Sequence, residues 1–375
     1  MRNFFIAIAA SGALLAAVPA SAIVTTTAYG LSQPTYPIDQ TTDLVLHDAG
    51  RNRDVHYRIT YPVGQGPFPV VLFSHGFGGS KDGYRPLIDF WARHGYLCVQ
   101  PSHEDAGLLK GGIDEIRELL AEQDLPASRL RAADLTLAID QLDQIEQQIP
   151  ALKAKIDRGH IAAAGHSLGA YTAMVLGGAT SYFKGEDPTR LSDPRIRAII
   201  AMSPQGIGAQ GLKKDSFQTI DRPMMSITGS LDSGLGTQSP NWRKQPFLES
   251  KVGDKYLVFL QGARHLAFTG AYASRAEEIE ERRASMDPNN TVPPLGDPGP
   301  YGRGNVMNDG RGMNTDRRNA GPMRFNPTVE QRVFEAIQRT SLAFLDLYLK
   351  GSTPARTFLQ SDELTKAKVG QITRK

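Results

Sequence analysis

The chain has 375 residues, and its 42 Lys and Arg nearly balance its 39 Asp and Glu, which gives a formal net charge of +3. Hydrophobic residues make up 40% of the sequence and charged residues 22%, proportions that are typical of a folded globular protein. The near-neutral charge gives no electrostatic reason for a nucleic-acid partner, and we expect none. A single cysteine, Cys98, excludes intramolecular disulfides and multi-cysteine metal sites.

The first 22 residues have the features of an export signal. A positive start, Met1-Arg2-Asn3, precedes an apolar run over residues 4–18, and Ala20-Ser21-Ala22 supplies the small-x-small pattern of a cleavage site. We therefore expect a mature chain that is periplasmic or secreted. The alternative is an uncleaved membrane anchor, but the apolar run is shorter than the roughly 20 residues that span a bilayer. We expect no transmembrane span in the mature chain.

After an extended arm at residues 23–42, the pattern predicts one domain over residues 43–375. Alternating residues at 43–47 and 55–61 predict a hairpin, and later apolar runs predict strands buried on both faces. Strands that alternate with helices predict an α/β fold with a mostly parallel central sheet and helices on both faces. The strands are expected at residues 69–74, 96–100, 161–164, 196–202, 224–227 and 256–260. Helices are expected at residues 84–94, from an N-terminal cap at Ser128 to about residue 149, from the residue after 167 to about 176, and at 334–349.

One long segment interrupts this pattern. Residues 286–327 contain 7 Gly, 7 Pro and 7 Asn with little apolar periodicity. Loops of this length inside a compact domain are uncommon, and those that occur are either functional or disordered. A disordered surface insertion and an active-site lid both fit, and the first is favoured slightly.

A sequence that fits a nucleophile elbow lies at Gly165-His166-Ser167-Leu168-Gly169. It follows a predicted strand and begins a helix, which is the setting in which a strained turn lifts a serine hydroxyl above the strand edge. Gly165 and Gly169 are needed because a side chain at either position would collide with a neighbouring strand or helix. The alternative is a glycine-rich turn with a capping serine. We predict that Ser167 is a nucleophile.

A serine nucleophile requires a base and an orienting acid, which follow it along the chain in proteins with this elbow. His265 is the one histidine after Ser167, and it stands in a turn behind a predicted strand. Asp232 follows the predicted strand at 224–227, whereas Asp221 and Asp254 precede strands and fall at the other sheet edge. We predict His265 as the base and Asp232 as the acid, with a solvated loop carboxylate as the alternative for Asp232.

The developing oxyanion requires two donors. One is expected to be the backbone N–H of Leu168, the residue after the nucleophile. The other is expected from the loop His75-Gly76-Phe77-Gly78-Gly79, where the N–H of Phe77 is our choice and that of Gly78 is the second option.

The remaining chemically active side chains are expected to have structural roles. We predict that His75 and His166 brace their turns, because each precedes a site residue. His103, Glu104 and Asp105 lie in a loop without ligands at helical spacing, so we expect a pocket rim and no metal site. Cys98 lies within a predicted strand and is expected in the core.

These motifs resemble those of a known family. HGFGG at residues 75–79, GHSLG at 165–169, GSLD at 229–232 and GARHLAFTG at 262–270 resemble the α/β-hydrolase superfamily. SHGFGGSKDGY and HGYLCVQPSH look like a branch that contains predicted dienelactone hydrolases, chlorophyllases and platelet-activating-factor acetylhydrolases. The resemblance spans about residues 44–268 and 343–351. It implies serine-dependent hydrolysis of carboxylic esters without a metal or organic cofactor.

Two features separate this chain from the family pattern. Dienelactone hydrolases use a cysteine nucleophile where this chain has Ser167, and the segment 286–327 has no counterpart. The sequence therefore predicts an exported esterase for small or lipid-like esters, favouring short to medium acyl chains. A lipase, a cutinase-like polyester hydrolase, an acyltransferase and a non-catalytic binding protein of the same fold remain alternatives.

Overall fold

The computed structural model describes residues 29–30, 35–108, 126–234, 238–271 and 327–375. The predicted export signal at residues 1–22, half of the predicted arm and residues 286–326 of the predicted insertion lie outside the described residues.

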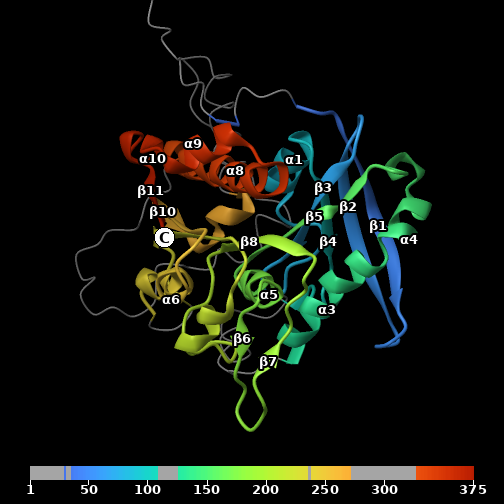
Figure 1. Cartoon of the computed structure of the whole chain (residues 1–375), viewed down its shortest axis with the longest axis horizontal. Coiled ribbons are helices and arrows are strands. Elements are labelled where there is room, and N and C mark those ends of the chain that lie inside the picture. Colours follow the sequence, from blue (N-terminus) through green and yellow to red (C-terminus); the bar gives the residue numbers. More distant parts are fainter. Residues whose placement is uncertain (1–28, 31–34, 109–125, 235–237, 272–326) are drawn as a thin grey trace, which may run out of the picture.

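The described chain forms one large mixed sheet in the strand order β1-β2-β4-β3-β5-β8-β9-β10-β11 (Figure 1). The six strands from β4 to β10 in this order are parallel. At one side β2 pairs antiparallel with β4 and with the edge strand β1, and at the other side β11 pairs antiparallel with β10. Their bounds are β1 Ile38–Asp48, β2 Arg53–Pro62, β3 Phe68–Ser74, β4 Leu97–Pro101, β5 Ile156–His166, β8 Ile196–Met202, β9 Met224–Leu231, β10 Lys255–Arg264 and β11 Gly370–Arg374. A separate small ribbon pairs β6 (Thr180–Ser181) with β7 (Thr189–Arg190).

The predicted fold class and the predicted hairpin are confirmed. The boundaries differ, because β1 begins at Ile38 and so takes in the last residues of the predicted arm. Strands β9 and β10 also extend past their apolar runs to Leu231 and Arg264. Their parallel pairing continues beyond a register shift after Leu260, so backbone hydrogen bonds carry these strands through glycine and polar residues.

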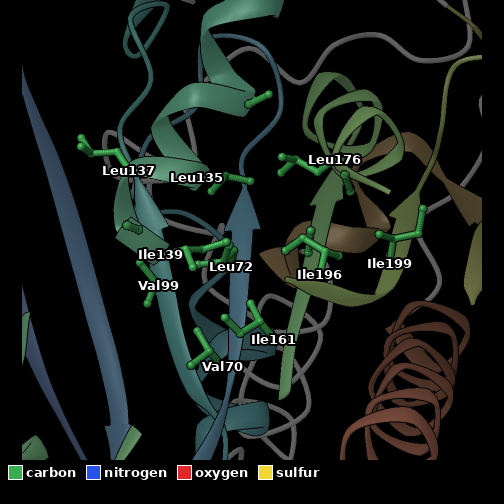
Figure 2. Close-up of a cluster of buried hydrophobic side chains, with 14 of the residues drawn as sticks. Val70, Leu72, Val99, Leu135, Leu137, Ile139, Ile161, Leu176, Ile196 and Ile199 are labelled. Atoms are coloured by element: carbon green, nitrogen blue, oxygen red, sulfur yellow. The ribbon is translucent and has the colours of Figure 1, made fainter. Parts of the chain in front are cut away.

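Helices cover both faces of the sheet, and each face has its own core (Figure 1). Successive residues of a strand point to opposite faces. On β3, Val70 and Leu72 therefore enter one core and Val71 and Phe73 the other. Figure 2 shows the first core, where β3 side chains meet those of α3 and α5. The helices of this face are α3 Pro126–Asp140, α4 Leu142–Gln148 and α5 Leu168–Leu176, and those of the other face include α1 Arg85–Arg93, α8 Pro327–Lys350, α9 Thr353–Gln360 and α10 Glu363–Lys366.

The prediction of one long helix that starts at Ser128 is wrong in two respects. The helix begins at Pro126, so Ser128 is a helical residue and not its cap. It is also interrupted at Gln141, where φ is −110° and ψ is 26°, and continues as α4. Apolar spacing alone does not reveal this break, because both helices bury residues on the same side against the sheet.

Parallel strands bring the loops after β3, β4, β5, β8, β9 and β10 to one edge of the sheet, where ligands bind in open α/β sheets. Short helical turns complete this edge: η4 (Pro240–Lys244), which continues into α6 (Gln245–Glu249), and η5 (His265–Thr269). Two further turns are η2 (Pro150–Leu152) and η3 (Lys214–Thr219). Among the described residues, no helix has the length and apolar character needed to cross a membrane.

Candidate active site

Ser167 lies between β5 and α5 in a strained backbone conformation, with φ at 54° and ψ at −120°. Side chains are rare in this region, and such strain persists where the surrounding structure enforces it. A Cβ built on Gly165 overlaps the backbone of Gly169, and a Cβ on Gly169 overlaps the carbonyl oxygen of Ser74. Both glycines of the predicted elbow are thus required by backbone contacts. The absence of a side chain at Gly169 also allows the start of α5 to lie close against the end of β3.

The predicted acid and base are brought together at the same sheet edge. Asp232 follows β9, His265 begins η5 after β10, and His265 Nδ1 lies 3.0 Å from Asp232 Oδ1. The Asp232 side chain is fully buried, and the His265 side chain is 16% exposed. Asp232 Oδ2 accepts a hydrogen bond from Thr228 Oγ1 at 2.8 Å. With the Nδ1 proton donated to the carboxylate, the lone pair of Nε2 is the basic position of the imidazole.

Two further residues surround this pair, and the sequence analysis missed both. The hydroxyl of Ser203, which follows β8, donates to Asp232 Oδ1 at 2.8 Å and lies 2.7 Å from His265 Nδ1. Arg243 of η4 places Nε 2.9 Å from Asp232 Oδ1 and Nη2 3.2 Å from His265 Nδ1. No spacing in the sequence connects Ser203 or Arg243 with the predicted triad. The one local hint is that Ser203 follows a buried strand.

The electrostatic environment keeps Asp232 ionised. Burial alone would raise the pKa of its carboxyl group, but the charge of Arg243 and the hydrogen bonds from His265 and Ser203 lower this pKa to about 2. A carboxylate that stays charged across the neutral range can hold the imidazole in one orientation and stabilise its protonated form.

A chain of hydrogen bonds connects three loops of the site through Tyr84. The N–H of Gly76 donates to the Tyr84 hydroxyl at 3.0 Å, and this hydroxyl lies 2.8 Å from His166 Nδ1. His166 Nε2 donates to the carbonyl oxygen of His265 at 2.8 Å. Burial lowers the pKa of His166 well below its usual value, so the ring is neutral and its Nδ1 accepts from Tyr84. The residue before Ser167 is thereby bonded to the backbone of the predicted base.

The backbone amides of the predicted oxyanion loop have different partners. Gly76 donates to Tyr84, Gly78 donates to Asp105 Oδ2 at 2.9 Å, and Gly79 donates to the Gly76 carbonyl at 3.1 Å. The Phe77 amide donates to no atom of the described residues. The amide of Gly78, our second option, is therefore already engaged, whereas that of Phe77 is available to a ligand. Leu168 is the first residue of α5, where backbone N–H groups have no partner inside the helix.

A buried ion pair lies beneath this loop. Arg131 of α3 and Asp105 are each 1% exposed, with Arg131 Nη2 2.6 Å from Asp105 Oδ2. Arg131 also donates to the carbonyl oxygens of His75 and Gly76, at 2.5 and 3.2 Å. The same Asp105 oxygen accepts the Gly78 amide. The pair therefore fixes the loop on both sides of Phe77.

Two neutral histidines complete this network. His75 donates from Nδ1 to the Gly76 carbonyl at 2.6 Å and accepts the His103 amide on Nε2 at 3.1 Å. His103 lies between Asp134 Oδ2, 2.8 Å from Nδ1, and Ser74 Oγ, 2.9 Å from Nε2. Burial and a neighbouring guanidinium lower the pKa of both imidazoles well below the usual value.

The roles predicted for the other reactive side chains have mixed outcomes. His75 and His166 brace their turns as predicted. In the loop predicted as a pocket rim, His103 and Asp105 are only 2% and 1% exposed, because their partners lie beneath the loop. Cys98 is fully buried, and burial raises the pKa of its thiol well above the usual range. Within the described ranges, no group of three or more His, Cys, Asp or Glu is placed to hold a metal ion.

The fold is that of an α/β hydrolase. The sequence profile described as the alpha/beta hydrolase family matches residues 71–349, which is more than half of the chain. The chain therefore belongs to the alpha/beta hydrolase family. A search of curated proteins found no match.

Proposed function

We propose that this protein is an exported serine esterase, which cleaves carboxylic esters of short to medium acyl chains through Ser167, His265 and Asp232. The observation that carries the proposal is the strained Ser167 turn at the same sheet edge as a buried Asp232 carboxylate bonded to His265 Nδ1 at 3.0 Å. The order Ser, Asp, His along the chain also fits this family. The features of residues 1–22 support export, and the motifs shared with acetylhydrolases and chlorophyllases support an ester substrate.

The reaction follows from the roles of these groups. The Ser167 oxygen attacks the ester carbonyl carbon while His265 Nε2 takes the hydroxyl proton. The tetrahedral intermediate collapses, the ester C–O bond breaks, and His265 returns the proton to the departing alcohol. A water molecule then attacks the acyl-enzyme, again giving its proton to His265, and the carboxylic acid leaves as Ser167 is restored. Asp232 holds the imidazole orientation throughout.

The oxyanion is proposed to bind the amides of Phe77 and Leu168. The available Phe77 amide and the position of Leu168 at the start of α5 support this choice. The dipole of α5 also favours negative charge at its N-terminus. Loss of one oxyanion donor typically lowers the rate by about 10²–10³-fold.

The test is Ser167→Ala, assayed with p-nitrophenyl esters of increasing acyl length and with a fluorophosphonate probe. We expect the variant to lose ester turnover and labelling while its circular dichroism spectrum stays unchanged, because the nucleophile alone is removed. Ser361→Ala is the matched control, since this serine is the C-cap of α9 and belongs to none of the site motifs. This variant should be labelled by the probe as the wild type is. Labelling of Ser167→Ala equal to that of the wild type contradicts the proposal. A wild-type protein that neither labels nor turns over esters indicates a non-catalytic member of the fold.

A further inference from the structure

Arg243 is a buried arginine whose position is fixed by two loops of the catalytic edge. Only 3% of the residue is exposed, and each guanidinium nitrogen has a partner. Its Nη1 donates to the carbonyl oxygens of Ser203 and Pro204 at 2.8 and 3.2 Å, and Nη2 to that of Ser233 at 3.1 Å. Its Nε donates to the carbonyl oxygen of Asp232 at 3.2 Å. A guanidinium held in this way connects the loops after β8 and β9.

The charge of Arg243 acts on the same carboxylate oxygen that orients His265. Asp232 Oδ1 lies 2.9 Å from Arg243 Nε and 3.0 Å from His265 Nδ1, so the two cationic groups compete for one anion when the imidazole is protonated. Arg243 Nη2 is also only 3.2 Å from His265 Nδ1. A like charge at such a distance disfavours the protonated imidazole, and burial strengthens this effect because water does not screen it.

The Asp232 carboxylate offsets part of this charge, but it is shared between the arginine and the imidazole. The His166 ring, with its centroid 4.7 Å from that of His265, is neutral for the reason given above. Two ion pairs of opposite sign also lie on elements that pack against or precede η5. These pairs are Arg264 of β10 with Glu330 of α8, and Arg85 with Asp89 on α1.

We propose that Arg243 is a positioning residue that fixes the acid loop against the base and weakens proton binding to His265, so that the base remains unprotonated to a lower pH than it would without this charge. The proposal rests on the proposed function, because it concerns the same acid and base. Arg243 touches neither substrate nor reacting atoms and acts through Asp232 and His265.

The test follows the His265 Cε1–H signal by NMR during a pH titration, in a Ser167→Ala background that needs no turnover. The signal is assigned by its absence from the spectrum of a His265→Gln variant. Replacing Arg243 with Met should move the titration midpoint to higher pH by about 1 unit, because the imidazolium loses a neighbouring like charge. Arg243→Lys keeps the charge, so its midpoint should stay closer to that of the parent than to that of the Met variant. The acid limb of kcat/KM for ester turnover should shift in parallel in the Ser167 enzyme.

Arg158→Met is the matched control, because it removes an arginine from the opposite end of β5 and should leave the midpoint unchanged. Near-UV circular dichroism checks the fold at each pH. Where Arg243→Met does not fold, Arg243→Gln replaces it, since the amide can still donate to a backbone carbonyl.

An unchanged or lower midpoint in the neutral variant overturns the proposal. The proposal is also overturned if Arg243→Met and Arg243→Gln both unfold while Arg243→Lys folds and keeps the titration midpoint of the parent protein. In that case the charge at this position is needed only for folding. Absence of ester turnover in all proteins would reject the proposed function, while the NMR titration still decides the role of Arg243.

Discussion

Tyr84 has an unusual combination of backbone conformation and hydrogen bonding. Its φ of 61° is in the left-handed region, which costs a bulky residue about 1–3 kcal/mol. Its buried hydroxyl joins the Gly76 amide to His166, and burial raises the pKa of Tyr84 to about 12, so the hydroxyl keeps its proton. The strain is therefore retained at a position where one hydroxyl orients the oxyanion loop, the elbow and the base loop.

Tyr84→Phe should lower kcat by about tenfold with a smaller change in KM, because the Gly76 amide loses its acceptor and the loop around Phe77 relaxes. Steady-state kinetics with a p-nitrophenyl ester measures this split. Tyr61→Phe is the matched control, since its hydroxyl donates to Asp39 at 3.0 Å on the hairpin. A Tyr84 variant that loses stability but keeps wild-type kcat would show that the hydroxyl serves folding alone.

At the scale of elements, the strands of the parallel sheet were predictable because each is a short apolar run buried on both faces. The polar strand β11 was not predicted because it depends on tertiary pairing with β10. The helix break at Gln141 was not predicted because the apolar spacing continues across it. The elbow was predictable because its constraint is local. Arg243 and Ser203 were not, because they reach the site from the ends of other elements and carry no motif.

The close approach of α5 and β3 is the element-scale contact on which the elbow depends. Gly169→Ala should destabilise the protein by at least about 3 kcal/mol, because its Cβ overlaps the Ser74 carbonyl and neither backbone has room to move. Urea unfolding measures the loss. Gly159→Ala, within β5, has only an ordinary contact at its Cβ and should change the unfolding free energy far less. Equal stability of the two variants would contradict the proposed packing constraint.

At the scale of the whole molecule, the proposed catalytic edge is built over buried histidines that stay neutral. His75, His103 and His166 are each 2% exposed or less, and burial lowers the pKa of each well below its usual value. In the unfolded chain the same side chains bind protons below about pH 6.5. Their contribution to stability is therefore complete above that pH and is lost as the pH falls toward the folded-state pKa values. The carboxyl groups of Asp105 and Asp232 each have a pKa of about 2, so their protonation causes a second loss of folding stability below about pH 4.

The unfolding free energy should accordingly fall by up to about 4 kcal/mol per pH unit below pH 6.5, since each histidine contributes about 1.4 kcal/mol per unit. Urea unfolding at a series of pH values from about 7.5 to 5 measures this slope. His103→Gln should reduce the slope by about one third, because the unfolded chain then takes up one proton fewer. His160→Gln is the matched control, because the His160 side chain is 49% exposed and the slope should stay as in the wild type. An unchanged slope in His103→Gln would contradict the assignment of His103 as a buried neutral imidazole, and with it the account of how the loop is supported.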